Sequence, residues 1–192
     1  MGRIVITTNI SLDGIVQDPD GREGFGRGGW FNQYGGTDLG EWASVETREA
    51  LGADALLLGR GSDEWFASRW SSRSGEWADK LNSLPKYVVS STLTEAKWSN
   101  STVITGDVVS EVAKVKRQIS GEILIYASYQ LVHTLIEHDL VDEFRLVVFP
   151  VVLGTGQRLF AETSDTKPLR LINVSTIGDG LAFLTYEVVK NA

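Results

Sequence analysis

Apolar and polar positions along the chain follow two patterns, which predict strands and helices in alternation. Short runs of apolar and β-branched residues are typical of strands, and unbroken runs are typical of strands buried on both faces. Apolar residues that recur every three or four positions predict helices with one buried face. We predict strands at residues 3–11, 55–58, 86–90, 102–105 and 123–127. We predict helices at 41–50, at 108–119 and from 129 onward, with shorter helical segments at 63–66 and 77–81.

The last third of the chain departs from this alternation. An apolar run at 144–153 predicts a further strand. The final two predicted strands, at 169–176 and 182–189, are separated by Gly178-Asp179-Gly180 and by no helix. They therefore predict an antiparallel hairpin at one edge of the sheet. The whole pattern predicts an α/β fold with a mixed, mostly parallel sheet, and we expect residues 1–192 to form a single domain.

The segment at residues 18–40 lacks both patterns and is predicted to be a loop. It is rich in glycine and carries Trp30, Phe31 and Tyr34. A long loop of this kind within a compact domain is typical either of a functional lid or of a disordered segment. Both alternatives stay open, and the lid would bring the three aromatic side chains to a substrate. A second, exposed loop is predicted at residues 68–75.

Composition narrows the function classes. The chain has 192 residues, of which 42% are hydrophobic and 22% charged, as in an ordinary globular protein. It has no cysteine, which excludes disulfides and thiolate metal sites. Its net charge of −7 argues against nucleic-acid and anionic-membrane partners, which need a basic surface. Since the sequence also lacks a long apolar span and a signal-peptide pattern, we expect a cytoplasmic protein that acts on a small molecule.

Three predicted strands end in segments suited to an anion. These segments are Gly59-Arg60-Gly61-Ser62, Ser90-Ser91-Thr92 and Ala127-Ser128-Tyr129-Gln130. Hydroxyls, a guanidinium and the free N–H groups of helix starts all favour a phosphate. In open α/β sheets, ligands bind at the carboxyl ends of the strands. Each segment alone is more simply a turn with a helix cap, but three of them at equivalent places favour one shared anion site.

Other motifs carry less weight. A G-x-G-x-x-G match at residues 24–29 lies in the predicted loop, without the adjoining strand and helix that a dinucleotide fingerprint needs. His133 and His138 are five residues apart on or beside one helix, so their side chains diverge and we expect no metal site. No nucleophile-elbow motif accompanies them, which disfavours a hydrolase. Asp13 ends the first strand, where it would either serve a substrate as a proton source or stabilise a turn before Gly14. Both roles stay open.

Six short motifs follow one another in a characteristic order and spacing. They are Ser11-Leu12-Asp13-Gly14, Leu56-Leu57-Leu58-Gly59-Arg60 with Glu64, Lys86-Tyr87-Val88-Val89-Ser90, Leu140-Val141-Asp142-Glu143, Pro150-Val151-Val152-Leu153-Gly154-Thr155-Gly156 and Arg158-Leu159-Phe160. Together they resemble the dihydrofolate-reductase-like family, in particular the branch related to the reductase domain of riboflavin-biosynthesis deaminase-reductases. The resemblance implies a three-layer fold, an NADPH-dependent reductase and a homodimer.

The same resemblance implies a role for each candidate site residue. Gly59, Arg60 and Ser62 would hold cofactor phosphate, and Ser90, Ser91 and Thr92 would hold the adenosine end with its 2′-phosphate. The corner from Ala127 through Ser128, Tyr129 and Gln130 to Leu131 would hold the pyrophosphate close to the nicotinamide. Asp13 and Gly14 would border the nicotinamide and the substrate.

The chain departs from the family pattern at one position. The family usually has a glycine where this chain has Ala127, and the added methyl group would weaken or prevent close approach of the cofactor. The acidic residue that dihydrofolate reductases carry after their lid loop cannot be matched to Asp38, Glu41 or Glu46 from the sequence. We therefore predict an NADPH-dependent reductase of a small heterocyclic or conjugated substrate. The alternatives are a non-catalytic ligand-binding or interaction module, and a reductase that holds a flavin or folate-like ring under the aromatic lid.

Overall fold

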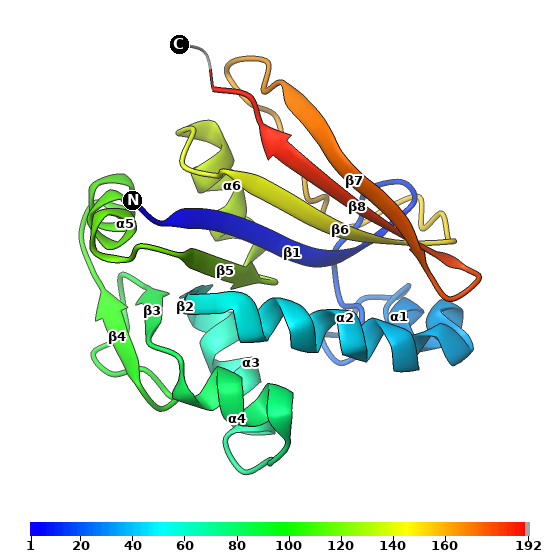
Figure 1. Ribbon diagram of the computed structural model, residues 1–192, viewed down its shortest axis with the longest axis horizontal. Helices are drawn as coiled ribbons and strands as arrows, with labels where there is room; N and C mark the ends of the chain where they lie inside the picture. Colours follow the sequence, from blue (N-terminus) through cyan, green and yellow to red (C-terminus); the bar gives the residue numbers. More distant parts are fainter. Residues whose placement is uncertain (191–192) are drawn as a thin grey trace.

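A computed structural model describes residues 1–190 of the protein. Its strands form one eight-stranded sheet in the order β4-β3-β2-β5-β1-β6-β8-β7 (Figure 1). The strands are β1 (Arg3–Ser11), β2 (Ala53–Gly59), β3 (Lys86–Val89), β4 (Ser101–Ile104), β5 (Glu122–Tyr126), β6 (Glu143–Phe149), β7 (Leu169–Ile177) and β8 (Leu181–Val188). All eight predicted strands are confirmed, although the one predicted at 144–153 ends at Phe149.

The strands from β4 to β6 run parallel to one another, and β8 and β7 close the other edge in antiparallel pairing. The predicted α/β fold, with its mostly parallel sheet and C-terminal hairpin, is confirmed. The chain turns between β7 and β8 at Gly178, which has a φ of 56°. A glycine adopts this left-handed conformation without steric cost.

Six α-helices flank the sheet. They are α1 (Trp30–Gly35), α2 (Leu39–Gly52), α3 (Arg60–Trp70), α4 (Glu76–Ser83), α5 (Val108–Gln118) and α6 (Tyr129–Glu137), with a short 3₁₀ turn, η1 (Gly36–Asp38), before α2. The helices predicted at 41–50, 63–66, 77–81, 108–119 and after 129 are confirmed.

The prediction of a loop at residues 18–40 is wrong for the second half of that segment, which forms α1, η1 and the start of α2. Trp30 is fully buried, and its ring packs edge-on against Phe149 at 5.3 Å between centroids. This contact spans more than a hundred residues, so no local pattern could reveal it. The exposed loop predicted at 68–75 is likewise helical at its start, since α3 continues to Trp70.

Two layers of core lie on opposite faces of the central strands. On β1, Ile4 and Ile6 pack in the cluster that includes Val112 of α5 and Leu135 of α6. Val5, between them, packs in the cluster that includes residues of α2, α3 and α4. Side chains alternate between the faces of a strand, so a strand covered on both sides must be apolar throughout. This explains the unbroken apolar runs in β2 and β5 and confirms the three layers. No helix among residues 1–190 is long and apolar enough to cross a membrane.

Candidate functional site

A cavity of about 860 Å³ opens at the carboxyl edge of the parallel strands. All three predicted strand ends line it, with Gly59–Ser62 after β2, Ser90–Thr92 after β3 and Ala127–Leu131 after β5. They meet because β2 lies between β3 and β5 in the sheet. The pairing of Gly59 with Val89 sets Arg60 beside Ser90 at this edge. Parallel pairing thus gathers segments that are far apart in the sequence.

Ser128 joins two of the three corners. Its hydroxyl donates to Ser62 Oγ at 2.7 Å and accepts the N–H of Gly59 at 3.0 Å. Helices α3 and α6 both begin here, so the N–H groups of their first turns and the positive ends of their dipoles meet at the cavity. Ala127 and Ser128 have φ values of 51° and 56°, in the left-handed region. Such a conformation costs a non-glycine residue about 1–2 kcal/mol, and strain of this kind is often concentrated at functional sites.

Arg60 is the one cationic side chain among the residues that line the cavity. It is exposed, and within residues 1–190 it forms neither an ion pair nor a side-chain hydrogen bond. Its neighbour Ser90 organises a turn by accepting the N–H groups of Thr92 at 3.2 Å and Leu93 at 3.1 Å. A free guanidinium beside hydroxyls matches a phosphate, to which it can donate two hydrogen bonds.

A second part of the cavity lining is aromatic, and the sequence interpretation did not identify it. Its rings come from α2, α3, α4 and β5, and they are Trp42, Trp65, Phe66, Trp70, Trp77 and Tyr126. Five of these rings are in continuous contact through Phe66 and Trp77, since the rings of Trp70 and Trp77 meet edge-on at 4.3 Å and Phe66 lies 5.9 Å from Tyr126, whereas Trp42 packs against Phe31. From the sequence these residues look like ordinary core positions of amphipathic helices.

Glu46 of α2 lies in the wall of the same cavity with only 5% of its surface exposed. No group within residues 1–190 donates a hydrogen bond to its carboxyl. Burial raises the pKa of Glu46 well above its usual range, and the negative charge of Glu49 raises it further. Glu46 therefore keeps its proton at a pH where an exposed glutamate has lost it. A buried, partnerless carboxylic acid in a cavity is a candidate proton donor.

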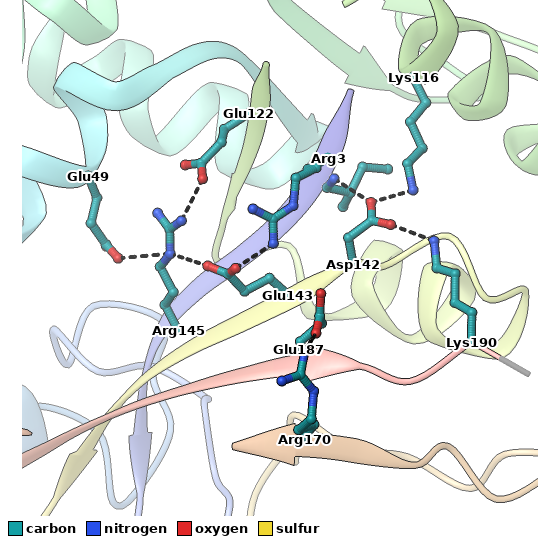
Figure 2. A network of polar contacts seen from close by, with 11 residues as sticks. Arg3, Glu49, Lys116, Glu122, Asp142, Glu143, Arg145, Arg170, Glu187 and Lys190 are labelled. Atoms are coloured by element: carbon teal, nitrogen blue, oxygen red, sulfur yellow. Dashed lines mark hydrogen bonds and ion pairs between the residues drawn. The ribbon is translucent and has the colours of Figure 1, made fainter. Parts of the chain in front are cut away.

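Glu49, one turn further along α2, connects this acid to a charged network (Figure 2). It accepts the hydroxyl of Thr7 at 2.7 Å and lies 3.6 Å from Nε of Arg145. Figure 2 shows the Arg145 guanidinium among Glu49, Glu122 and Glu143, with 2.7 Å to Glu122 and 2.6 Å to Glu143. Burial opposes the charge of Arg145, but these carboxylates outweigh it and raise the pKa of Arg145. Three carboxylates thus share one arginine.

Asp13 and Gly14 do not line the cavity. The Asp13 carboxylate accepts the hydroxyl of Ser11 and the N–H groups of Leu153 and Gly154 at 2.7 to 3.0 Å. Burial works to raise the pKa of Asp13, but these hydrogen bonds outweigh it and lower the pKa to about 2. A carboxyl so acidic does not hold a proton near neutral pH. Asp13 instead ties the segment after β6 to the end of β1, which is the turn-stabilising alternative.

The aromatic residues of the predicted lid also lie outside the cavity. Trp30 is buried in the core, and its indole N–H donates to the carbonyl of Gln17 at 2.9 Å. Phe31 packs against Trp42 at 4.8 Å, and Tyr34 is 40% exposed and away from the cavity lining. Among residues 1–190, no group of three or more His, Cys, Asp and Glu residues could hold a metal ion.

The sequence is similar to those of known proteins over nearly its whole length. The family model described as the RibD C-terminal domain matches residues 3–183. The protein YyaP of Bacillus subtilis (strain 168) is 26% identical over 195 residues, which cover 96% of this chain and 94% of that protein.

Solved structures share the fold of this chain. A putative riboflavin biosynthesis protein from Shewanella sp. PV-4 superposes with a TM-score of 0.73 at 23% identity, covering 98% of this chain and 99% of the other. Dihydrofolate reductase from Enterococcus faecalis, solved in complex with NADP(H), superposes with a TM-score of 0.62 at 12% identity, covering 98% and 97% of the two chains. The resemblance inferred from the six motifs and the dihydrofolate-reductase-like fold are both confirmed.

Proposed function

Because the chain belongs to the RibD C-terminal domain family, we propose that it is an NADPH-dependent reductase of a small heterocyclic substrate. One observation carries the proposal. A single cavity joins an end suited to phosphate groups, at Arg60 and two helix starts, to a buried carboxylic acid without a partner, Glu46. Binding a dinucleotide needs the first feature, and protonating a reduced substrate needs the second.

The residues at the strand ends fit the phosphates of NADPH. The pyrophosphate would lie at the starts of α3 and α6, where free N–H groups bind anions without a cation. The 2′-phosphate would lie between Arg60 and the hydroxyls of Ser90, Ser91 and Thr92, which share one edge of the sheet. The Ala127 methyl group is exposed beside the first of these positions, so it narrows the approach to the α6 start.

When bound, NADPH supplies a hydride, which carries two electrons. Reduction of a neutral C=N or polarised C=C bond also consumes one proton, which must reach the other atom of that bond. Glu46 would hold this proton on its carboxyl oxygen and release it as charge develops, since burial favours its neutral form. The resulting carboxylate recovers a proton from solvent through the open cavity. The aromatic walls around Glu46 would orient the ring and exclude water.

The proposal is tested by titrating the protein with NADPH and following the fluorescence of the cofactor. We expect saturable binding below millimolar concentration, with NADH weaker than NADPH. Absence of binding at millimolar NADPH would contradict the proposal.

A second function is favoured by one observation, the left-handed Ala127 with its methyl group at the cofactor corner. In this alternative the protein is a ligand-binding module that cannot accept the dinucleotide. It predicts that the wild type does not bind NADPH and that an Ala127→Gly variant does.

A further inference from the structure

The cavity has an uneven distribution of charge. Among residues 1–190, Arg60 is the one cation that lines it, and it lies at the end of β2. Four carboxylic acids line the cavity elsewhere, and they are Asp18, Asp20, Glu23 and Glu46. If Arg60 binds a cofactor phosphate, as the proposed function requires, no cation among the lining residues is left for the substrate. A substrate with its own phosphate or carboxylate would then meet only acids.

The cations nearest to these acids are already engaged. Arg69 lies 3.6 Å from Asp20, which also accepts the indole N–H of Trp65 at 3.2 Å. The Arg69 guanidinium covers the Trp65 ring at 4.3 Å and is not part of the cavity lining. Asp18 has no paired cation within residues 1–190, and its carboxylate instead accepts the N–H groups of Arg22, Glu23 and Phe25. Neither arrangement leaves a donor that would recognise an anion.

Glu23 adds to this negative field. Burial raises its pKa, and the charges of Asp18 and Asp20 raise it further, as expected where carboxylates lie close together. Such a region of the cavity repels an anionic group and accepts a neutral or positively charged one.

The walls between these acids are flat and aromatic. Trp42 and Glu46 come from α2, Trp65 and Trp70 from α3, and Trp77 from α4, so three helices present rings to one space. Aromatic rings pack face to edge or offset on other planar rings, and their faces also attract cations. Glu46 is the buried acid of this space that accepts no hydrogen bond within residues 1–190, and the indole N–H groups of Trp70 and Trp77 and the Tyr126 hydroxyl also lack partners there.

We propose that this protein reduces a planar ring compound that carries no negative charge. The ring lies among the tryptophans of α2, α3 and α4 with a nitrogen or other polar edge toward Glu46. The reduction, and the occupation of Arg60 by the cofactor, rest on the proposed function, whereas the charge preference of the space around Glu46 follows from the acids that line the cavity. The proposal excludes phosphorylated substrates.

The test uses three probes of nearly equal shape and different charge, which are quinoline, N-methylquinolinium and quinoline-6-carboxylate. Each is titrated by calorimetry into the full chain carrying Arg60→Ala, so that the carboxylate cannot bind the cation that the cofactor would occupy. We expect quinoline and N-methylquinolinium to bind at least tenfold more tightly than the carboxylate. Equal or tighter binding of the carboxylate would overturn the inference, and so would failure of all three to bind at millimolar concentration.

A pair of glutamate variants assigns the polar edge. Glu46→Gln keeps the size of the side chain but cannot lose a proton to solvent and become negatively charged when a cation binds beside it. We therefore expect N-methylquinolinium to lose roughly tenfold in affinity and quinoline much less. Glu64→Gln is the matched control, because Glu64 is exposed on α3 and does not line the cavity. If the ratio of the N-methylquinolinium affinity to the quinoline affinity is the same in Glu46→Gln as in the protein with Glu46, the placement of the ring is refuted.

These outcomes separate the two proposals. A protein that binds NADPH but prefers the carboxylate probe contradicts only the substrate class. A protein that binds the neutral and cationic rings but not NADPH contradicts only the proposed reductase.

Discussion

The two halves of the sheet differ sharply in how they are covered. In the parallel half, β5 is buried along nearly its whole length, and helices lie on both of its faces (Figure 1). In the antiparallel half, eight of the nine residues of β7 are exposed. Within residues 1–190, no residue that lines the cavity comes from the two antiparallel edge strands, β7 and β8. The ligand site therefore belongs to the parallel half alone.

The exposed half has a different chemical character. Leu171 and Val174 are 50% and 60% exposed on the outermost strand, beside Tyr186 and Leu184 of β8. β7 is also an edge, with one side of its backbone unpaired. Its one charged residue, Arg170, is already paired with Glu187, so a second copy would meet no free charge there. Apolar edge strands that are left uncovered are typical of self-association, and this face is where we expect the predicted homodimer to form.

The largest effect should come from the acid in the parallel half. Glu46→Gln should slow reduction of a neutral C=N ring by roughly 10²–10⁴-fold, the usual contribution of a general acid, with NADPH affinity unchanged. Wild-type turnover should fall as pH rises through the raised pKa of Glu46, because only the protonated form donates. The rate is followed as NADPH oxidation. N-methylquinolinium needs no proton, so its maximal rate should change little, and an equal loss with both rings would contradict the role of Glu46.

Removing the free cation should have the next largest effect. Arg60→Ala should weaken NADPH by roughly 10- to 100-fold, since a charged hydrogen-bonded pair contributes about 1.5–3 kcal/mol. The affinity for NADH, which lacks the 2′-phosphate, should fall less. Fluorescence titration measures both. Arg117→Ala on the exposed side of α5 is the control, and equal losses of NADPH and NADH would move Arg60 from the 2′-phosphate to the pyrophosphate.

The sequence predicted this parallel half well for a physical reason. Strands buried on both faces must be apolar throughout, so β2 and β5 stand out as runs. Parallel strands share one carboxyl edge, so their ends could be brought together without knowing any side-chain contact. The segments at Arg60, Ser90 and Ala127 do line one cavity.

The aromatic wall of the cavity, with Glu46, could not be predicted from the sequence in the same way. Its residues reach the cavity because α2, α3 and α4 pack together, and a sequence does not say which helices are neighbours. One signal was present. Trp42, Val45, Glu46 and Glu49 are spaced as one face of a helix, and acids on an apolar face are unusual enough to suggest a role. The lid hypothesis for Trp30, Phe31 and Tyr34 lacked such a signal, because burial of Trp30 depends on the distant Phe149.

The exposed half can be tested separately. Val174→Lys introduces a charge on the apolar face of β7 and should raise the concentration needed for dimer formation by at least tenfold, while NADPH affinity stays the same. Light scattering after size exclusion measures the assembly. Ser175→Lys projects from the other face of the strand and should have a smaller effect. A wild type that is monomeric at high concentration would contradict the homodimer. A loss of NADPH binding in Val174→Lys would contradict the independence of the ligand site from the antiparallel half of the sheet.

Asp13 links the end of β1 to the segment that follows β6. Its pKa in the folded protein, about 2, lies below its ordinary value of 3.8, so it stabilises the fold above that ordinary value. The contribution is lost as pH falls from about 4 toward 2. Asp13→Asn should lower the free energy of unfolding by about 1 kcal/mol at pH 7, after allowance for solvent screening. Thermal unfolding measures it. The difference between variant and wild type should shrink at pH 2.5, and a constant difference would contradict the ionic origin.

The smallest effect should come from the corner where the chain departs from its relatives. Ala127→Gly removes a left-handed conformation that costs about 1–2 kcal/mol, but glycine adds about 0.5–1 kcal/mol of chain entropy to the unfolded state. The free energy of unfolding should therefore rise by only about 0.5 kcal/mol. Ala113→Gly in the interior of α5 lacks this strain and should lose about 1 kcal/mol. If both variants lose the same amount in thermal unfolding, the strain at Ala127 has no energetic consequence. If Ala127→Gly also tightens NADPH by a few fold, the methyl group limits how closely the cofactor approaches the start of α6.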